Sequence, residues 1–416
     1  MKELTVIYRG YGQNIELGTL ADDGQVLLFQ YSAAAIACGL ELSPIRLPLR
    51  IAAYPDQQTQ YVNLQRLPGL LYDSLPDSWG NRLMLRHLKA HGINPDTLSA
   101  LDRLAYLGEN TMGALTYVPS GSLLNAGTSL NLAQLAAEIQ AVLTDVDREV
   151  LAEVARVGGS PGGARPKALV YFNPQSGQMS TQPGHVDNAQ AWLVKFASDD
   201  DEADSCALEY LYARIAQHCE LGMMATHFFE LPGGLSAFGT QRFDRLGQQR
   251  VHVHSLAGLL HANFQIPSVS YEDFFRTTRH LTRDLRELKK AVQRCAFNVL
   301  MNNRDDHAKN ISYQQERDGT WRLAPPYDLT YCPGYQGQHF MDVVGEGRAP
   351  TREHIIKAAK TAGLGACDTG AIIDDLLARA TPALIREWAR QLPIRSKTVA
   401  LVTKAMEVNC ARLRKA

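Results

Sequence analysis

Residues 298–313 read NVLMNNRDDHAKNISY, and this stretch decides how the rest of the chain is interpreted. Eight polar side chains crowd between two apolar segments, more than a simple reversal of the chain needs. Asp305 precedes Asn310 by five residues, so one tight turn can present a carboxylate and an amide oxygen on the same face. Phosphoryl transfer uses such groups: a carboxylate near the acceptor hydroxyl, and oxygen ligands that hold Mg²⁺ against the phosphates.

A second aspartate further along the chain supports this interpretation. Protein-kinase catalytic loops use the spacing D-x-x-x-x-N, with the Asp as base and the Asn on the metal. Eighteen residues after Asn310, the stretch LAPPYDLTY (323–331) places Asp328 after an apolar run, where kinases carry a metal-binding Asp. The alternative for Asp305, Asp306 and His307 is a solvated turn that caps a helix, and taken alone that would be favoured. The order of the upstream and downstream motifs favours the kinase.

The upstream motif is the glycine-rich stretch GGSPGGARPKALV (158–170). Its glycines let backbone N–H groups approach phosphate oxygens, and Lys167 adds a positive charge. It lacks the GK[ST] of a Walker A loop, and it runs into a strand, which a dinucleotide fingerprint does not. The alternative is a flexible linker between subdomains. Ser160 is exposed by this setting and is a candidate phosphorylation site.

Lys195 stands in the apolar stretch WLVKFA (192–197). Burying a lysine among apolar residues is costly unless an anion pairs with it, and in a kinase that anion is an ATP phosphate. Glu209 on the following helix is a candidate partner, with Glu202 as a competitor. The alternative is a lysine on an edge strand that points to solvent, which period-two alternation permits.

The pattern of hydrophobic residues predicts an α+β fold with two lobes and a cleft between them. Strands and hairpins are expected at 5–10, 15–31, 113–121, 168–172, 191–197 and 227–245, and helices at 75–92, 98–108, 130–144 and 207–220. Asp77 or Ser78 can cap the helix at 75–92. After Arg245 the chain reads as mostly helical, apart from 310–332. We divide it into a β-rich N-terminal part (1–120), an ATP-binding N-lobe with the glycine-rich loop (121–245) and a helical C-lobe with the catalytic loop (246–416).

The composition narrows the class of protein. The chain has 416 residues, of which 45% are hydrophobic and 20% charged, with a formal net charge of -1. A nucleic-acid-binding surface over most of the protein would normally give a basic excess, so any such contact is local or made through a partner. Seven scattered cysteines without a CxxC pair argue against a disulfide framework or a zinc ribbon. MKELTVIYRG lacks the apolar core of a signal peptide, and we expect a cytoplasmic protein without membrane contact.

Two further groups of residues carry less weight. His252, His254 and His261 invite a metal interpretation, but two His at i, i+2 need only share one face of a strand. The terminal run RLRKA, with Arg395 and Lys397, is a modest basic patch and is better explained as a solvated helix end than as a DNA-reading element.

Seven strings carry a family resemblance. They are LPDSWGNRL, GENTMGAL, GGSPGGARPK, WLVKF, QRFDR, RDDHAKN and LAPPYDL. In this order they resemble the HipA family of bacterial toxin kinases, from about residue 60 to residue 335, and the D-x-H-x-K-N box with RFDR is specific. The resemblance implies a two-lobed, protein-kinase-like fold of HipA type.

The resemblance also implies roles for individual residues. Asp305, two residues before His307, is the implied catalytic base, and Asn310 and Asp328 are the implied Mg²⁺ ligands. Ser160, seven residues before Lys167, matches a serine that family members phosphorylate on themselves, which expels the glycine-rich loop and switches the kinase off. The positions that match ATP contacts are Gly162, Gly163, Ala164, Arg165, Lys167, Lys195, Gln241, Phe243, His307, Lys309 and Tyr327.

The chain departs from the family pattern at two positions. Gln241 stands where a Glu often precedes RFDR, and its amide still serves as donor or acceptor toward adenine. Pro166 stiffens the loop before Lys167, which puts the mobility of the loop in question. Neither change removes a group that the chemistry requires.

The resemblance finally implies cofactors and partners. A HipA-type Ser/Thr kinase toxin uses ATP and Mg²⁺, pairs with a HipB-like DNA-binding antitoxin, contacts DNA only through it, and phosphorylates a translation component such as an aminoacyl-tRNA synthetase. One alternative is a kinase of the same fold with another target and little toxicity. Another is a catalytically silent fold that acts as a corepressor or binding module with the antitoxin. The presence of Lys195, Asp305 and Asp328, together with Asn310, counts against silence.

Overall fold

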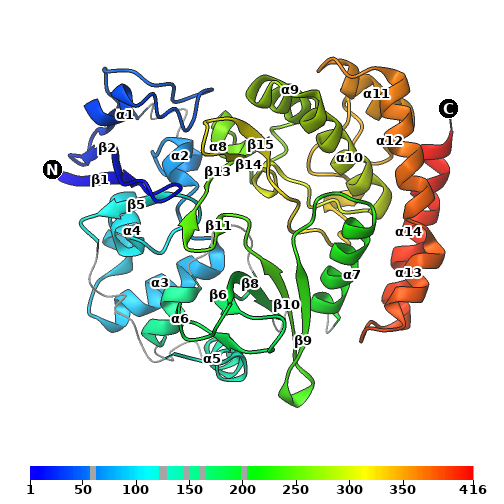
Figure 1. The fold of residues 1–416 in the computed structure, drawn as a ribbon, viewed down its shortest axis with the longest axis horizontal. Coiled ribbons are helices and arrows are strands. Elements are labelled where there is room, and N and C mark those ends of the chain that lie inside the picture. The colour runs from blue at the N-terminus through cyan, green and yellow to red at the C-terminus, as the bar shows by residue number, and fades with distance from the viewer. Residues whose placement is uncertain (57–61, 121–128, 145–149, 159–164, 198–203, 416) are drawn as a thin grey trace.

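The computed structural model describes residues 1–56, 62–120, 129–144, 150–158, 165–197 and 204–415. In this part of the chain, short antiparallel sheets and a helical region follow one another. Figure 1 shows the N-terminal sheet and the C-terminal helices at opposite ends of the molecule, with a small three-stranded sheet between them. This order of sheets and helices matches the expected α+β arrangement, so the predicted fold class is confirmed.

The N-terminal sheet has the strand order β4-β3-β2-β1-β5, with antiparallel neighbours. Buried and exposed residues alternate along its strands, so that one face packs on α1, α2 and α4. The predicted hairpin turns at Asp23-Gly24, where the Asp23 side chain accepts the N–H groups of Gln25 and Val26. The elements are β1 (Lys2–Tyr8), β2 (Ile15–Asp22), β3 (Leu27–Tyr31), β4 (Tyr54–Pro55), β5 (Leu115–Val118), α1 (Ala33–Ala37), α2 (Gly69–Tyr72) and α4 (Ala100–Leu107).

The middle sheet has the strand order β7-β6-β8-β10-β9 and is antiparallel throughout. Its β6 and β8 share a hydrophobic core with α3, α5 and α6, whereas β10 shares a smaller one with α7. The sheet therefore lies between two groups of helices. The elements are β6 (Lys167–Phe172), β7 (Met179–Ser180), β8 (Gln190–Phe196), β9 (Thr226–Glu230), β10 (Ser236–Gln241), α3 (Ser78–Ala90), α5 (Leu132–Thr144), α6 (Ala152–Val157) and α7 (Ser205–His218).

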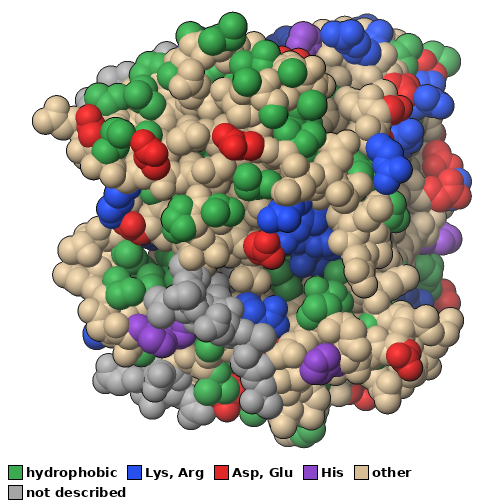
Figure 2. Space-filling view, turned by 60° about the vertical axis from the view of Figure 1, so that its left-hand side comes forward, with side chains coloured by type: hydrophobic (Ala, Val, Ile, Leu, Met, Phe, Trp, Pro, Cys, Tyr) green, Lys and Arg blue, Asp and Glu red, His purple; other side chains and the backbone are tan. Residues whose placement is uncertain are grey.

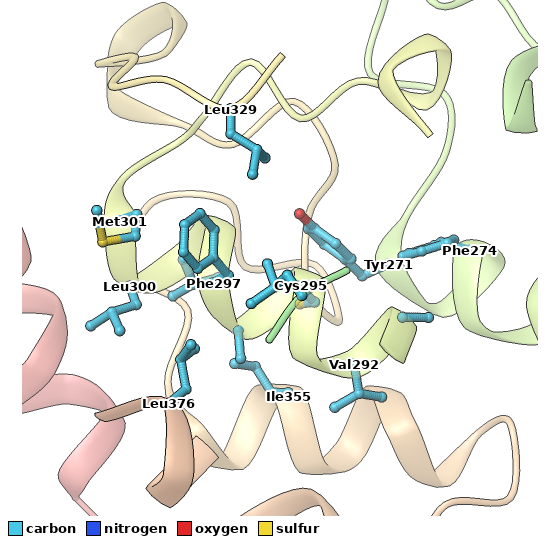
Figure 3. Packing of buried hydrophobic residues seen from close by; sticks show 14 of the residues in the cluster. Tyr271, Phe274, Val292, Cys295, Phe297, Leu300, Met301, Leu329, Ile355 and Leu376 are labelled. Carbon is cyan, nitrogen blue, oxygen red and sulfur yellow. The ribbon is translucent and has the colours of Figure 1, made fainter. Parts of the chain in front are cut away.

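The C-terminal region is built around α10, which packs against its neighbours through one large core. Figure 3 shows side chains of α9 and α10 meeting those of α11 and α12 in this core. The helices are α8 (Leu256–Leu260), α9 (Tyr271–Thr282), α10 (Leu285–Met301), α11 (Arg352–Lys360), α12 (Ala366–Arg379), α13 (Pro382–Ala389) and α14 (Ser396–Arg414). Between α10 and α11, most of residues 302–351 belong to neither a helix nor a strand.

Two expectations for the C-terminal region are wrong. The chain just after Arg245 forms strands, and the non-helical stretch runs from 302 to 351 and not only from 310 to 332. The HVHS stretch (252–255) pairs with a strand that follows the loop at 302–311, a long-range partner that local pattern does not reveal. The strands are β11 (Arg245–Leu246), β12 (Gln249–Arg250), β13 (His252–Ser255), β14 (Ser312–Gln315) and β15 (Trp321–Leu323).

The surface is mixed in charge. On the face drawn in Figure 2, Lys and Arg side chains form one group near the middle, beside acidic and hydrophobic side chains. Among the described residues, no helix is long and apolar enough to cross a membrane.

Candidate active site

A cavity of about 110 Å³ is walled by all three parts of the chain. The N-terminal part contributes the end of α2 and β5, the middle sheet contributes β8 and β10, and the C-terminal part contributes β13 and the chain around Tyr327. Most of the wall is apolar, and we call the part formed by the contacting side chains of Lys195, Glu209 and Asp328 its charged end. The charged residues that line the cavity are Asp73, Lys195, Glu209, Arg242, Lys309 and Asp328.

Lys195 lies on an interior strand of the middle sheet and is 7% exposed. Successive residues of a strand face opposite sides, so Val194 enters the core with α3, α5 and α6 and Lys195 faces α7. There its Nζ donates to Glu209 Oε1 at 2.6 Å and to Asp328. Burial alone would lower the pKa of Lys195, but the two carboxylates raise it well above its usual value. The edge-strand alternative is wrong, and Glu202 lies outside the described residues.

The catalytic-loop candidate begins where α10 ends. Asn302 caps the helix in the left-handed conformation (φ 53°), and the following residues turn back toward β14. Asp306 is buried and accepts hydrogen bonds from Tyr271 Oη at 2.6 Å, His339 Nδ1 at 2.8 Å and the Phe340 N–H at 2.8 Å. The Asp306 carboxylate therefore anchors the chain and has no free face for chemistry.

Asp305, in contrast, keeps 57% of its side chain exposed. Partial desolvation raises the pKa of Asp305, the nearby His307 lowers it, and the negative charges of Asp328 and Asp306 raise it further. The Nε2 atom of His307 lies 3.9 Å from Asp305 Oδ1. The Asn310 side chain donates through Nδ2 to the Asp305 carbonyl oxygen at 2.9 Å, which ties the two ends of the loop together.

An aromatic pair forms another part of the cavity wall. The rings of Phe243 and Tyr327 are stacked, with centroids 5.7 Å apart and planes at 28°. Tyr327 Oη shares a hydrogen bond with Ser312 Oγ at 2.7 Å and donates to the Lys309 carbonyl at 2.8 Å. Gln241 lies on the same wall, so an aromatic base could stack there beside an amide.

The N-terminal part contributes Asp73, a residue that sequence reasoning missed. Its carboxylate accepts from Lys309 Nζ, from the N–H and Oγ of Ser255 (both 2.7 Å) and pairs with His254 Nδ1 at 2.6 Å. Burial opposes ionisation, but Lys309 and His254 hold the pKa of Asp73 far below its usual value. The string LYDSLPDSW carries this residue, but nothing in its local pattern distinguishes Asp73 from a helix end.

His254 also contacts Ser43, with 2.9 Å between Nε2 and Oγ. Ser43, His254 and Asp73 thus form a chain of hydrogen bonds, but the Ser43 side chain is fully buried and has no room for a substrate. In the described residues no three His, Cys, Asp or Glu side chains converge as metal ligands. The contacts of His254 therefore join the N-terminal part to β13.

Two family descriptions match the chain. Residues 159–384 match the HipA-like C-terminal domain, and residues 11–118 match the HipA N-terminal domain. The chain belongs to the HipA family. The resemblance seen in the sequence is confirmed.

The chain is similar to solved structures, and the first one named here has the same fold. The chain is 19% identical to HipA of Shewanella oneidensis MR-1, solved in a complex of the toxin–antitoxin proteins HipA and HipB with operator DNA. The match covers 99% of this chain and 97% of that chain, with a TM-score of 0.72. The Helicobacter pylori proinflammatory kinase CtkA is 12% identical over 61% of this chain and 90% of that chain, with a TM-score of 0.44. The search of curated proteins gave no match. The HipA-type fold, with a β-rich N-terminal part and a helical C-lobe, is confirmed by the first of these structures.

The structure brings together most of the described residues expected to bind nucleotide in this HipA-family chain. Asp305, Asn310 and His307 belong to the adjoining loop, and Arg165 Nη1 lies 3.4 Å from Glu209 Oε2. Four candidates, Ser160, Gly162, Gly163 and Ala164, lie outside the described residues. The candidates that line the cavity itself are Lys195, Gln241, Phe243, Lys309, Tyr327 and Asp328.

The donor set at the charged end fits a magnesium ion. Proteins usually bind Mg²⁺ through one or two carboxylates together with substrate phosphates. Burial alone would raise the pKa of Asp328, but Lys195 and Lys167 lower it to about 2, so this carboxylate is ionised at neutral pH. Asn310 uses its Nδ2 atom within the loop, which leaves Oδ1 as the atom that would hold the metal.

Proposed function

We propose that this HipA-family chain is a Ser/Thr protein kinase that transfers the γ-phosphate of Mg·ATP. One observation carries the proposal: the buried Lys195 is held by Glu209 and Asp328 in the wall of a cavity that an aromatic pair also lines. A buried lysine between two carboxylates is costly for a fold alone, and a nucleotide offers both a phosphate chain for the charged groups and a base for the aromatic rings.

The proposed chemistry assigns Asp305 as the base. A Ser or Thr hydroxyl of the substrate attacks the γ-phosphorus, the bond from the γ-phosphorus to the bridging oxygen breaks, and the hydroxyl proton passes to the exposed Asp305 carboxylate. When bound, Mg²⁺ on Asn310 and Asp328 supplies neutralising charge at the phosphate oxygens. Lys195 and Lys167 add positive charge at the same end, where low dielectric strengthens their effect.

The proposed setting is a toxin–antitoxin pair in the cytoplasm. The Shewanella HipA was solved with HipB and operator DNA, which supports a HipB-like antitoxin as partner here. A formal net charge of -1 fits DNA contact through that partner. The proposed substrate is a component of translation such as an aminoacyl-tRNA synthetase, and Ser160 is the proposed site of autophosphorylation. The division at residues 120 and 245 also stays a proposal.

Intact mass of the purified protein, measured before and after incubation with Mg·ATP, tests this function. We expect the wild type to gain phosphate on Ser160, Asp305→Asn to gain none, and Asp318→Asn, a change on the exposed β14–β15 turn, to behave as wild type. Loss of phosphate gain in Asp305→Asn alone would support Asp305 as base. Equal gain in the wild type and Asp305→Asn would contradict the site, and no gain in any variant, with ATP still bound, would favour the silent corepressor.

A further inference from the structure

Asp73 and Asp77 lie four residues apart in the N-terminal part, and each holds a lysine from another part of the chain. Asp73 follows α2 and pairs with Lys309 beside the catalytic loop. Asp77 precedes α3 and pairs with Lys167, with 2.5 Å between Nζ and Oδ2. One short segment of the N-terminal part therefore fixes a lysine on each of two segments expected to bind phosphate.

Asp77 is held in place by a second contact of its own. Its Oδ1 atom accepts the Gly80 N–H at 2.7 Å, which makes it the N-cap of α3. The side chains of Asp77 and Lys167 are only 3% and 2% exposed. Because the cap fixes the carboxylate, it also fixes the position of the Lys167 ammonium group at the start of β6.

The N-terminal part is tightly seated against the C-terminal part. Gly69 of α2 lies against Gly258 of α8, where a Cβ atom on Gly69 would overlap the Gly258 carbonyl oxygen. A Cβ atom on Gly258 would in turn crowd the Asp73 carboxylate. The close approach of these two helices places Asp73 within reach of Lys309.

Helix capping alone does not explain the carboxylate at position 77. An N-cap needs only an acceptor, and Asn, Ser and Asp are about equally effective. A buried carboxylate is costly unless it is paired, so the negative charge of Asp77 is explained by its ion pair with Lys167. Burial raises the pKa of Asp77 to about 6, against the lowering effect of Lys167, which leaves the carboxylate mainly ionised at neutral pH.

We propose that Asp77 is a positioning residue that holds Lys167 for the transferring phosphate, so that the N-terminal part completes the nucleotide site. The inference rests on the proposed kinase function. Asp77 does not touch the nucleotide in this scheme and acts through Lys167 alone. Lys167 lies directly opposite Lys195 across β6 and β8, and opposite residues of paired strands point to the same face of a sheet, so the Lys167 side chain lies on the face that carries Lys195.

Asp77→Asn is a suitable test because Asn keeps the cap and removes only the charge. The measurements are kcat and KM for ATP, the Kd of a non-hydrolysable Mg·ATP analogue, and Tm, for the wild type, Asp77→Asn, Lys167→Met and the double variant. We expect kcat of Asp77→Asn to fall roughly tenfold or more with KM changed less than about threefold, because misplacement of a charged group costs rate more than ground-state binding. The double variant should have the same kcat and Kd as Lys167→Met.

The matched control is Asp56→Asn. The Asp56 side chain pairs with Arg66 at 2.6 Å and is as deeply buried as that of Asp77, but its partner is not a residue expected to bind phosphate. We expect this variant to lose Tm and to keep kcat. If Lys167→Met does not fold, Asp77→Ser replaces it, because Ser also caps and should lose the same kcat as Asp77→Asn.

Three outcomes decide the inference. Wild-type kcat in Asp77→Asn, or losses that multiply in the double variant, would overturn it while the kinase proposal stands. A fall in kcat equal to that of Asp56→Asn would also overturn it, because the effect would then be one of general stability. A wild type that neither binds nor turns over ATP would overturn the proposed function, and this inference with it.

Discussion

Lys195 Nζ and Glu209 Oε1 lie 2.6 Å apart and join the middle sheet to α7. The pair links an interior strand to a helix that lies on the other side of the sheet from α3. Because Lys195 also reaches Asp328, any motion of α7 relative to the C-terminal part acts on the charged end of the cavity.

We expect Glu209→Gln to weaken both the fold and the site. The loss of a charged acceptor for a buried lysine should lower the free energy of unfolding by about 1–3 kcal/mol, and KM for ATP should rise because Lys195 is less firmly placed. Urea unfolding and steady-state kinetics measure the two effects. Glu230→Gln, at the exposed end of β9, is the control, and equal behaviour of the two variants would contradict the role of Glu209.

Asp305 and Asp306 are neighbours with opposite expected behaviour. Asp305→Asn should reduce phosphate transfer by about 10²–10⁴-fold, the range for a general base, with an unchanged unfolding curve. Asp306→Asn should lower the free energy of unfolding by about 2 kcal/mol or more, because it weakens a buried acceptor of three hydrogen bonds. Parallel activity assays and urea unfolding separate the two residues, and an unstable Asp305→Asn would reverse the assignment.

Asp244 should make stability depend on pH. Burial alone would raise the pKa of Asp244, but Arg242 and Arg245 hold it well below its usual value. A carboxyl with a depressed pKa stabilises the fold above its unfolded-state pKa, and the contribution is lost as the pH falls through the folded-state value. Asp244→Asn should therefore cost about 3 kcal/mol at neutral pH, and its difference from the wild type should shrink below about pH 4.

Urea unfolding at several pH values measures this difference. Asp318→Asn, in an exposed turn, serves as the control and should track the wild type throughout. A difference for Asp244→Asn that stays constant on acidification would show that shape, and not charge, sets the stability of this contact.

The stacked aromatic pair in the cavity wall should contribute to the affinity for nucleotide. Phe243→Ala removes one ring of the stacked pair with Tyr327, and aromatic stacking is worth about 0.5–1.5 kcal/mol, or roughly 2- to 12-fold in Kd. Titration with a Mg·ATP analogue measures this loss. Tyr335→Ala removes a ring that is 85% exposed and should leave Kd unchanged. Unchanged affinity in Phe243→Ala would place the base elsewhere.

Local pattern predicted most elements of the first two sheets. The hairpin across residues 15–31 alternates in burial as expected, and Asp77 caps α3 as proposed. The alternative given for His252 and His254, one face of a strand, corresponds to β13, but its partner β14 lies beyond three helices in the sequence and could not be found this way. Short strands depend on such distant partners more than on their own residues.

Candidate site residues could be predicted from the sequence where several of them lie in one short segment. Asp305 and Asn310 share a loop, and their contact follows from that spacing. The lysine partners of Asp73 and Asp77 could not be predicted, because they are distant in the chain and only the packing of α2 on α8 brings Lys309 near Asp73. A carboxylate at a helix end is common on a surface, and only burial shows that these two are paired inside.

The distance along the chain between Asp73 and Lys309 has a consequence for synthesis. The two residues are 236 positions apart, so a ribosome that adds about 5–20 residues per second makes the lysine on the order of 12–50 s after the aspartate. Until the end of that interval a nascent chain lacks Lys309 and Asp328, so the Asp73 carboxylate and the Lys195 ammonium group each lack a partner. On the proposed function, the growing polypeptide would therefore stay unable to hold nucleotide until most of it has been translated.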